Sequence, residues 1–224
     1  MTGGFYILRS PTLGQPEAEG LAVTDFLPLD PVVLADAPLC PVCGKPVGML
    51  PWLPPHRVQL EFWANEPGDI AFGTGDDLLL SERFRQMYEQ VGLVGLSGFD
   101  SVEVVRTKRY GKRKGIKPSG NYYLVRIARS RAAVDDKASE LVRPKGRYCE
   151  ECGGGDPEWA KRIVLRENTW SGEDIFYARG LPGRIMTSER YRDFHVENKI
   201  NNGILIDASE YGFDWRFGEG YKPG

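Results

Sequence analysis

Short apolar runs along the chain predict strands. Residues 5–8 form an aromatic and branched apolar run, residues 58–63 alternate between polar and apolar as a half-buried strand does, and residues 99–105 indicate a further strand. Residues 10–38 are rich in Pro and Gly, which favours irregular structure. Strands separated by turn-forming segments are therefore the main expected elements.

One stretch has the spacing of a helix. Ser81 is a good N-cap, and the apolar residues Phe84, Met87, Tyr88 and Val91 recur at i, i+3, i+4 and i+7. Gly92 can end the helix. The sequence predicts a helix that begins after Ser81 and packs through this one face.

The second half of the chain repeats the order of the first. Tyr122-Tyr123-Leu124-Val125-Arg126 resembles Phe5-Tyr6-Ile7-Leu8-Arg9, and a Ser-Glu-Arg-aromatic-Arg segment at 188–192 lies 107 residues after the same pattern at 81–85. Further landmarks keep an offset of 105–109: Cys149 after Cys40, Trp170 after Trp63, Asp174 after Asp69 and Gly203 after Gly95. A collinear set of this kind indicates an internal duplication.

Each unit then has the order strand, irregular segment, cysteine turn, strand, helix, strand. The expected fold is α+β, with one unit at 1–112 and a second at 113–224, packed as one compact domain about a pseudo-two-fold axis. In this arrangement His195 takes the place of Tyr88 in the duplicated helix, so we expect it to fill a packing position.

The four cysteines of the chain form two motifs of the same C-x-x-C-G pattern. Cys40 and Cys43 are followed by Gly44, and Cys149 and Cys152 are followed by Gly153. The C-x-x-C spacing lets two thiolates of one tight turn reach the same metal ion, and two such turns complete a tetrahedral Cys₄ zinc site. Glycine suits such turns because it accepts a positive φ.

The two motifs are 105 residues apart, whereas a compact zinc ribbon has roughly 15–20 residues between its pairs. The duplication explains this spacing, because equivalent turns meet when two equivalent halves pack together. We expect a structural zinc ion held by Cys40, Cys43, Cys149 and Cys152 to staple the halves. A disulfide framework and a thioredoxin-like redox pair are the alternatives; Lys45-Pro46 and Gly153-Gly154-Gly155 are poor helix starts, which weakens the redox interpretation.

Composition fits a soluble protein. The 224 residues are 41% hydrophobic and 27% charged, and no run approaches the roughly 18–20 apolar residues of a transmembrane helix. No secretory leader is visible, so we expect a reducing cytoplasm, where thiols stay free for metal, and no membrane partner. The net charge of −2 gives no global signal for nucleic acid.

A basic stretch lies between the halves. Seven of the 12 residues at 106–117 are Lys or Arg, which leaves 22 basic against 31 acidic residues, or −9, in the rest of the chain. Such a segment with Tyr110 could bind phosphate backbones. A solvated hairpin tip or linker, marked by Gly111, Gly115 and Pro118, is the interpretation that the confinement of the charge favours.

The residues give little support for catalysis. His56 follows Pro54-Pro55 in an expected loop, and no nucleophile elbow, phosphate-binding glycine loop or H-E-x-x-H helix is present. Arg83, Arg85, Arg190 and Arg192 lie near helix starts, where anions bind, but a capped helix with one charged face explains them better. We expect no enzyme.

The paired cysteine motifs, each followed by a tryptophan and a Ser-Glu-Arg-aromatic helix, resemble the double-CXXCG motif proteins of myxobacteria. The resemblance runs from the strand at Phe5 to about Gly212. That family is associated with immunity to swarming-inhibition toxins passed between neighbouring cells. The resemblance implies a non-enzymatic cytoplasmic protein that binds and neutralises a cognate toxin. A zinc-ribbon-like nucleic-acid-binding or regulatory protein that uses residues 106–117, and a thiol oxidoreductase, are the other classes to be tested.

Overall fold

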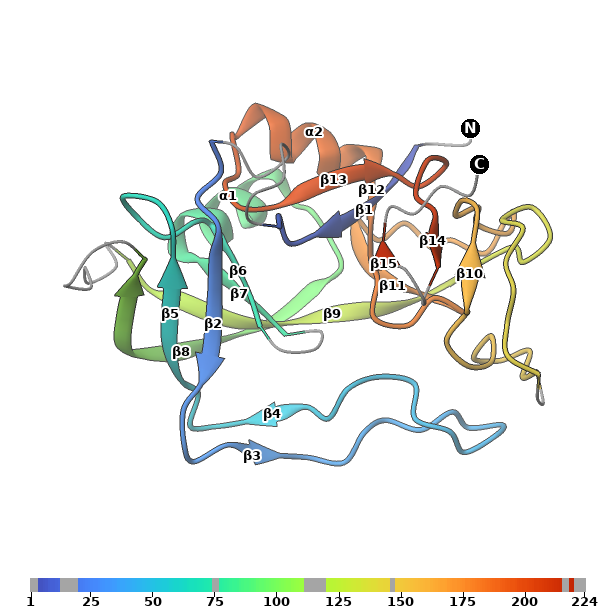
Figure 1. Ribbon diagram of the computed structural model, residues 1–224. Helices are drawn as coiled ribbons and strands as arrows, with labels where there is room; N and C mark the ends of the chain where they lie inside the picture. Colours follow the sequence, from blue (N-terminus) through green and yellow to red (C-terminus); the bar gives the residue numbers. More distant parts are fainter. Residues whose placement is uncertain are drawn as a thin grey trace.

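The structure, a computed structural model, describes residues 4–12, 20–73, 77–110, 120–145, 148–214 and 218–219. Strands dominate these residues, and they contain two helices (Figure 1). The strands are β1 (Phe5–Arg9), β2 (Thr24–Pro28), β3 (Val33–Leu34), β4 (Trp52–Leu53), β5 (Arg57–Phe62), β6 (Ile70–Phe72), β7 (Leu78–Ser81), β8 (Leu96–Arg109), β9 (Tyr122–Ala133), β10 (Trp159–Ala160), β11 (Ile175–Arg179), β12 (Ile185–Ser188), β13 (Ile204–Asp207), β14 (Phe213–Asp214) and β15 (Gly218–Glu219), and the helices are α1 (Glu82–Val91) and α2 (Glu189–Glu197).

Ten strands form one large sheet in the order β13-β1-β12-β11-β9-β7-β6-β2-β5-β8. The last strand, β8, also pairs with β9, so β9, β7, β6, β2, β5 and β8 close into a ring. Closure removes free sheet edges on this side of the molecule. The remaining strands β11, β12, β1 and β13 continue outward from the far end of β9.

Two strands, β1 and β9, pair with strands from the other half of the sequence. β1 comes first in the chain but pairs with β12 and β13, near the other end. The long strand β9 pairs with β7 and β8 through residues 122–127 and with β11 through residues 128–133. The halves 1–112 and 113–224 are therefore interleaved in one sheet.

Three groups of buried residues form the core. The closed ring contains Phe26, Val58, Leu60, Leu79 and Leu124 with their neighbours. A second group, with Ile7, Phe176 and Met186, lies around β11 and β12. A third joins both helices to the sheet and draws on both halves, since it includes Leu8, Ile70, Phe84, Tyr88, Ile175, Tyr191 and Phe194.

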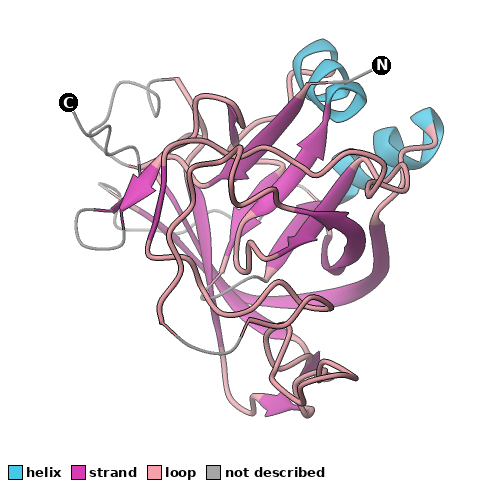
Figure 2. Cartoon of the chain, turned by 90° about the vertical axis from the view of Figure 1, so that its right-hand side faces the viewer, coloured by secondary structure: helices cyan, strands magenta, loops and turns pink. Residues whose placement is uncertain are grey.

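Both helices lie side by side at one end of the molecule (Figures 1 and 2). Ser81 and Ser188 cap them as expected, since the hydroxyl of each accepts a hydrogen bond from the backbone N–H three residues on. Gly92 ends α1 with a positive φ of 69°. Phe84 and Tyr88 are buried, but Val91 is exposed, so the apolar face of α1 is one residue shorter than its spacing predicted.

The fold is β-rich, and the expectation of an α+β fold is confirmed only in the coarse sense that two helices accompany the strands. The prediction of irregular structure at 10–38 was wrong for β2 and β3, whose runs are short and interrupted by proline. The hairpin of β6 and β7 before α1 was also missed. Among the described residues, no helix is long and apolar enough to cross a membrane.

Candidate metal centre

The first cysteine turn lies at the tip of a two-stranded arm, defined here as residues 30–55. β3 and β4 pair within this arm, which extends below the large sheet (Figure 1). Near the tip, the backbone N–H of Cys40 donates to the carbonyl of Lys45 at 2.8 Å, and the N–H of Gly44 donates to the carbonyl of Cys40 at 2.9 Å. Gly44 has a φ of 70°, as the tight turn requires.

The second cysteine turn has the same geometry but rests on the sheet. The N–H of Gly153 donates to the carbonyl of Cys149 at 2.8 Å, and Gly153 has a φ of 76°. The carbonyl of Cys152 accepts from the N–H of Gly180, in the turn between β11 and β12. A Cβ at Gly153 would lie only 2.4 Å from the Cα of Gly180, so the turn packs backbone against backbone.

The structure brings the two turns together. The Sγ atoms of Cys40 and Cys149 are 3.8 Å apart, those of Cys43 and Cys152 are 3.7 Å apart, and all four lie within 4.8 Å of one another. Zn–S bonds of about 2.3 Å in a tetrahedron give S···S edges of about 3.8 Å. A disulfide needs a separation of about 2 Å, and all four cysteines are free thiols. The predicted grouping of the four ligands is confirmed, and its donor set and spacing fit zinc.

The thiols of this cluster have shifted ionisation. Hydrogen bonds from the backbone N–H groups of Cys152 and Glu151 help to lower the pKa of Cys149 to about 7. Burial raises the pKa of Cys152 to about 12, and the neighbouring thiols add to the rise. Four thiolates in so small a volume repel one another, so full ionisation requires a cation among them. A divalent metal ion bound by the four sulfurs would supply that charge.

A second constellation, between the helices, was not expected from the sequence. The buried carboxylate of Asp174 accepts hydrogen bonds from Ser188 Oγ at 2.7 Å, from Arg190 at 2.9 Å and from the backbone N–H of Val94 at 2.9 Å. Arg190 also donates to the carbonyl of Val91 at 2.8 Å, at the end of α1. The start of α2 is thereby tied to the end of α1.

Equivalent contacts tie the start of α1 to the end of α2. The buried carboxylate of Asp69 accepts from Ser81 Oγ at 2.8 Å, from Arg83 and from the backbone N–H of Asn201 at 3.1 Å. Arg83 donates to the carbonyl of Asn198, at the end of α2. Arg83 and Arg190 therefore bind carboxylates and carbonyls of the chain itself. Only the pattern of a Ser-Glu-Arg segment after an Asp-Ile pair, present in each half, hinted at this arrangement.

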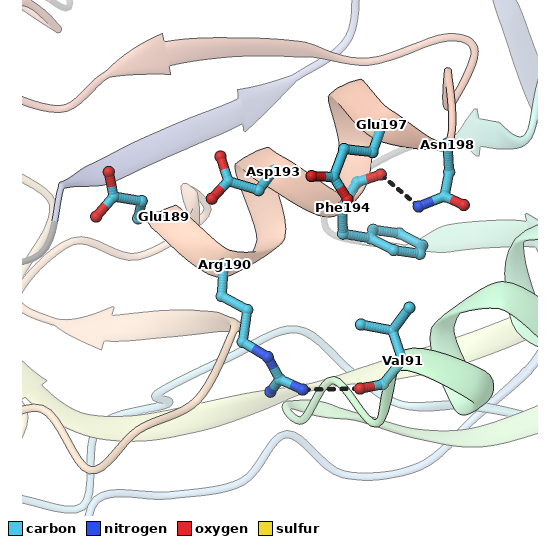
Figure 3. Close-up of a pocket in the computed structure, with 7 residues that line it drawn as sticks. All are labelled: Val91, Glu189, Arg190, Asp193, Phe194, Glu197 and Asn198. Atoms are coloured by element: carbon cyan, nitrogen blue, oxygen red, sulfur yellow. Dashed lines mark hydrogen bonds between the residues drawn. The ribbon is translucent and has the colours of Figure 1, made fainter.

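A shallow hollow of about 370 Å³ lies beside these contacts, between the helices (Figure 3). Its α2 wall carries Glu189, Asp193 and Glu197, which follow each other at intervals of four residues along one face. Val91 and Phe194 form its apolar part, and Arg190 crosses beneath (Figure 3). The hollow is acidic and open.

The two histidines serve as side chains of the interior. His56 is buried at the base of the arm, its ring packs edge-on against Trp52 at 4.9 Å, and Asp100 lies 4.0 Å from Nε2. Burial lowers the pKa of His56 and lowers that of His195 to about 4. His195 packs 6.2 Å from the ring of Tyr191, in agreement with the predicted packing position.

Only part of the basic segment can be placed, since residues 111–117 lie outside the described residues. Lys108 pairs with Glu61 at 3.3 Å and lies over the ring of Tyr110 at 4.4 Å. Tyr110 stacks on Trp63 with ring centroids 3.8 Å apart. Arg109 donates to the side-chain oxygen of Asn65 at 2.5 Å. The described base of the segment is thus bound to the body.

No model of a protein family matches the chain, and no curated protein matches it.

Proposed function

We propose that the chain is a non-enzymatic cytoplasmic protein that holds one structural zinc ion and neutralises a cognate toxin by binding it. The observation that carries the proposal is the four-cysteine cluster, in which two segments 109 residues apart bring four thiols within 4.8 Å. Zinc in this place joins the arm to the sheet, and its binding free energy contributes directly to folding stability.

We also propose that the two units arose by internal duplication. The support is that the same hydrogen bonds occur in both units. Asp69 accepts from Ser81 and Arg83 in the first unit, and Asp174 accepts from Ser188 and Arg190 in the second. The cysteine turns share hydrogen bonds and glycine geometry in the same way. A pseudo-two-fold relation of this kind gives zinc two ligands from each unit.

Toxin neutralisation rests on the resemblance of the paired cysteine and Ser-Glu-Arg motifs to the double-CXXCG proteins. The acidic wall of the hollow on α2 is compatible with a basic toxin surface, because complementary charge speeds association and orients the partners. A protein that acts by binding needs a stable scaffold but no positioned nucleophile. The metal centre would stabilise that scaffold.

Nucleic-acid binding through residues 106–117 is the alternative function. The ion pair of Lys108 with Glu61 offsets one positive charge of this segment, and Arg109 already donates a hydrogen bond to Asn65, so both side chains are less available to phosphates. Binding to DNA or RNA that weakens with salt, and that is lost when Lys112, Arg113 and Lys114 are replaced by Gln, would favour this alternative over neutralisation.

Metal analysis and thiol titration of the purified chain test the zinc proposal. We expect one zinc per chain and four thiols that react only after chelation. Freely reactive thiols without metal would overturn the zinc staple and favour a thiol oxidoreductase.

A growth assay tests neutralisation. A bacterial host that expresses the cognate toxin, identified by affinity capture with the zinc-loaded chain, should grow when the chain is co-expressed and arrest when it is absent. Growth arrest in both cases would refute neutralisation and leave the zinc result unaffected.

A further inference from the structure

The arm at residues 30–55 carries an unusual amount of exposed apolar surface. Eight of its side chains are exposed to between 39% and 72%, which is about half of each on average. They are Val32, Val33, Leu34, Leu39, Val42, Met49, Leu50 and Leu53. Single exposed apolar residues are common on protein surfaces, but a concentration of them in one projecting element marks an interaction site.

Both ends of the arm are fixed to the body, so this apolar surface cannot easily fold away. At the base, Trp52 is buried and stacks on Phe26 with ring centroids 6.4 Å apart. At the tip, Cys40 meets Cys149 in the metal centre. Between them, Gly48 lies so close to the guanidinium of Arg129 that a Cβ there would overlap it. The apolar side chains of the arm therefore stay exposed in the folded chain and are available to a binding partner.

The register of the arm shows which of its exposed side chains share a face. Leu34 pairs with Trp52, and Val33 pairs with Leu53. Successive residues of a strand point to opposite faces, and directly paired residues share a face. Val33 (42% exposed) and Leu53 (39% exposed) therefore lie together on the face opposite to the buried Trp52, and Leu34, on the same face as Trp52, is itself 50% exposed. Pro31 and Pro38 flank β3, so a partner contacts this face through side chains rather than by extending the ribbon.

We propose that a second copy of this chain covers the arm and that the protein forms a dimer through it, an inference that goes beyond the proposed function. In a two-fold interface each patch meets itself, so like charges near the axis repel, whereas apolar surface is complementary to itself. Asp30, Asp36 and Lys45 are the only charged residues of the arm, in a chain that is 27% charged.

The area of the arm suits this occupant. Eight half-exposed Val, Leu and Met side chains offer on the order of 400 Å² of apolar surface per copy. A standard interface buries about 800 Å² per partner, of which a little over half is apolar. A second copy is also present wherever the protein is made, so it covers the arm without any other component.

Sedimentation of the zinc-loaded full-length chain tests the dimer. We expect a dimer at chain concentrations of about 1 to 100 µM, because interfaces of standard size have dissociation constants from the micromolar range downward. The double variant Val33→Glu/Leu53→Glu places four carboxylates in the interface and should raise the dimer dissociation constant by at least 100-fold. The milder Val33→Thr keeps the branched side chain and should weaken the dimer in the same direction, which guards against a folding defect in the double variant.

Val196→Glu is the matched control, since Val196 is 65% exposed on α2, away from the arm. We expect it to leave the dimer unchanged. A wild-type chain that sediments as a monomer over the whole range would overturn the proposal, and so would an equal weakening by Val196→Glu. Neither result bears on toxin neutralisation, which the growth assay tests separately.

Discussion

Removal of one carboxylate between the helices should destabilise the whole protein. Asp174 is 3% exposed and accepts hydrogen bonds from Ser188, Arg190 and the backbone of Val94. Asp174→Ala deletes the acceptor of all three bonds at once. The donors stay in place, and the buried Ser188 hydroxyl and the Val94 N–H then have no carboxylate to bind.

The expected magnitude follows from these contacts. Bonds from Ser188 and Val94 to a charged acceptor contribute about 1.5–3 kcal/mol each. The Arg190 guanidinium is about half exposed, so its ion pair adds no more than about 1 kcal/mol after solvent screening. Allowing for relaxation, we expect a loss of about 3–5 kcal/mol in the free energy of unfolding, which lowers Tm by about 6–20 °C in a protein of this size.

Urea unfolding of the zinc-loaded protein, followed by tryptophan fluorescence, measures this loss. Asp193→Ala is the control on the same helix, because Asp193 is exposed and pairs only with Arg192 among the described residues. It should cost less than about 1 kcal/mol. Asp69→Ala removes the equivalent carboxylate and should match Asp174→Ala. A loss at Asp174 no larger than that at Asp193 would refute the reasoning.

Three further predictions concern the metal centre and the core. Cys40→Ser should abolish stoichiometric zinc in metal analysis. Because the proposed zinc ion links residues 109 apart, as a disulfide closing a loop of that length would, its loss should lower stability by about 4–5 kcal/mol in thermal unfolding. Full zinc retention would contradict this. Gly153→Ala should cost about 3 kcal/mol in urea unfolding, whereas Gly44→Ala, which has the same positive φ but open space around it, should cost about 1 kcal/mol. Equal costs would exclude the close packing at Gly153. The pKa of His195 is about 4 in the folded chain and about 6.5 when unfolded, so the unfolded state binds more protons between these pH values. The free energy of unfolding should therefore fall by about 2–3 kcal/mol from pH 6.5 to pH 4. His195→Met should flatten this pH dependence in urea unfolding, and an unchanged slope would contradict the prediction.

Local chemistry made some features of this protein predictable. The spacing of Cys40, Cys43, Cys149 and Cys152 indicated one shared metal centre, and the structure brings their thiols together. Ser81 was predictable as a cap because its hydroxyl acts on backbone only three residues away. Such signals act within a few residues, or depend on side chains with few other uses, so they can be recognised without knowledge of the fold.

The remaining features depend on contacts between distant segments. β2 has the proline-broken composition of a loop, and it is a strand because β5 and β6 flank it. Arg83 and Arg190 looked like surface charges of capped helices, since nothing near them in sequence shows that each reaches the end of the other helix. The composition of the arm gave no sign that it projects, because Val, Leu and Met ordinarily belong to a core.

The position of β1 in the sheet has a consequence for how the chain matures during synthesis. Its partner strands β12 and β13 begin 180 and 199 residues after it in the chain. At about 5–20 residues per second, a ribosome needs roughly 10–40 s to produce them. The closed ring of β9, β7, β6, β2, β5 and β8 is complete earlier, so the first strand to emerge is among the last to find its place. During this interval its apolar residues Ile7 and Leu8 have none of their native strand partners, and a chaperone that holds short apolar segments would have its opportunity there.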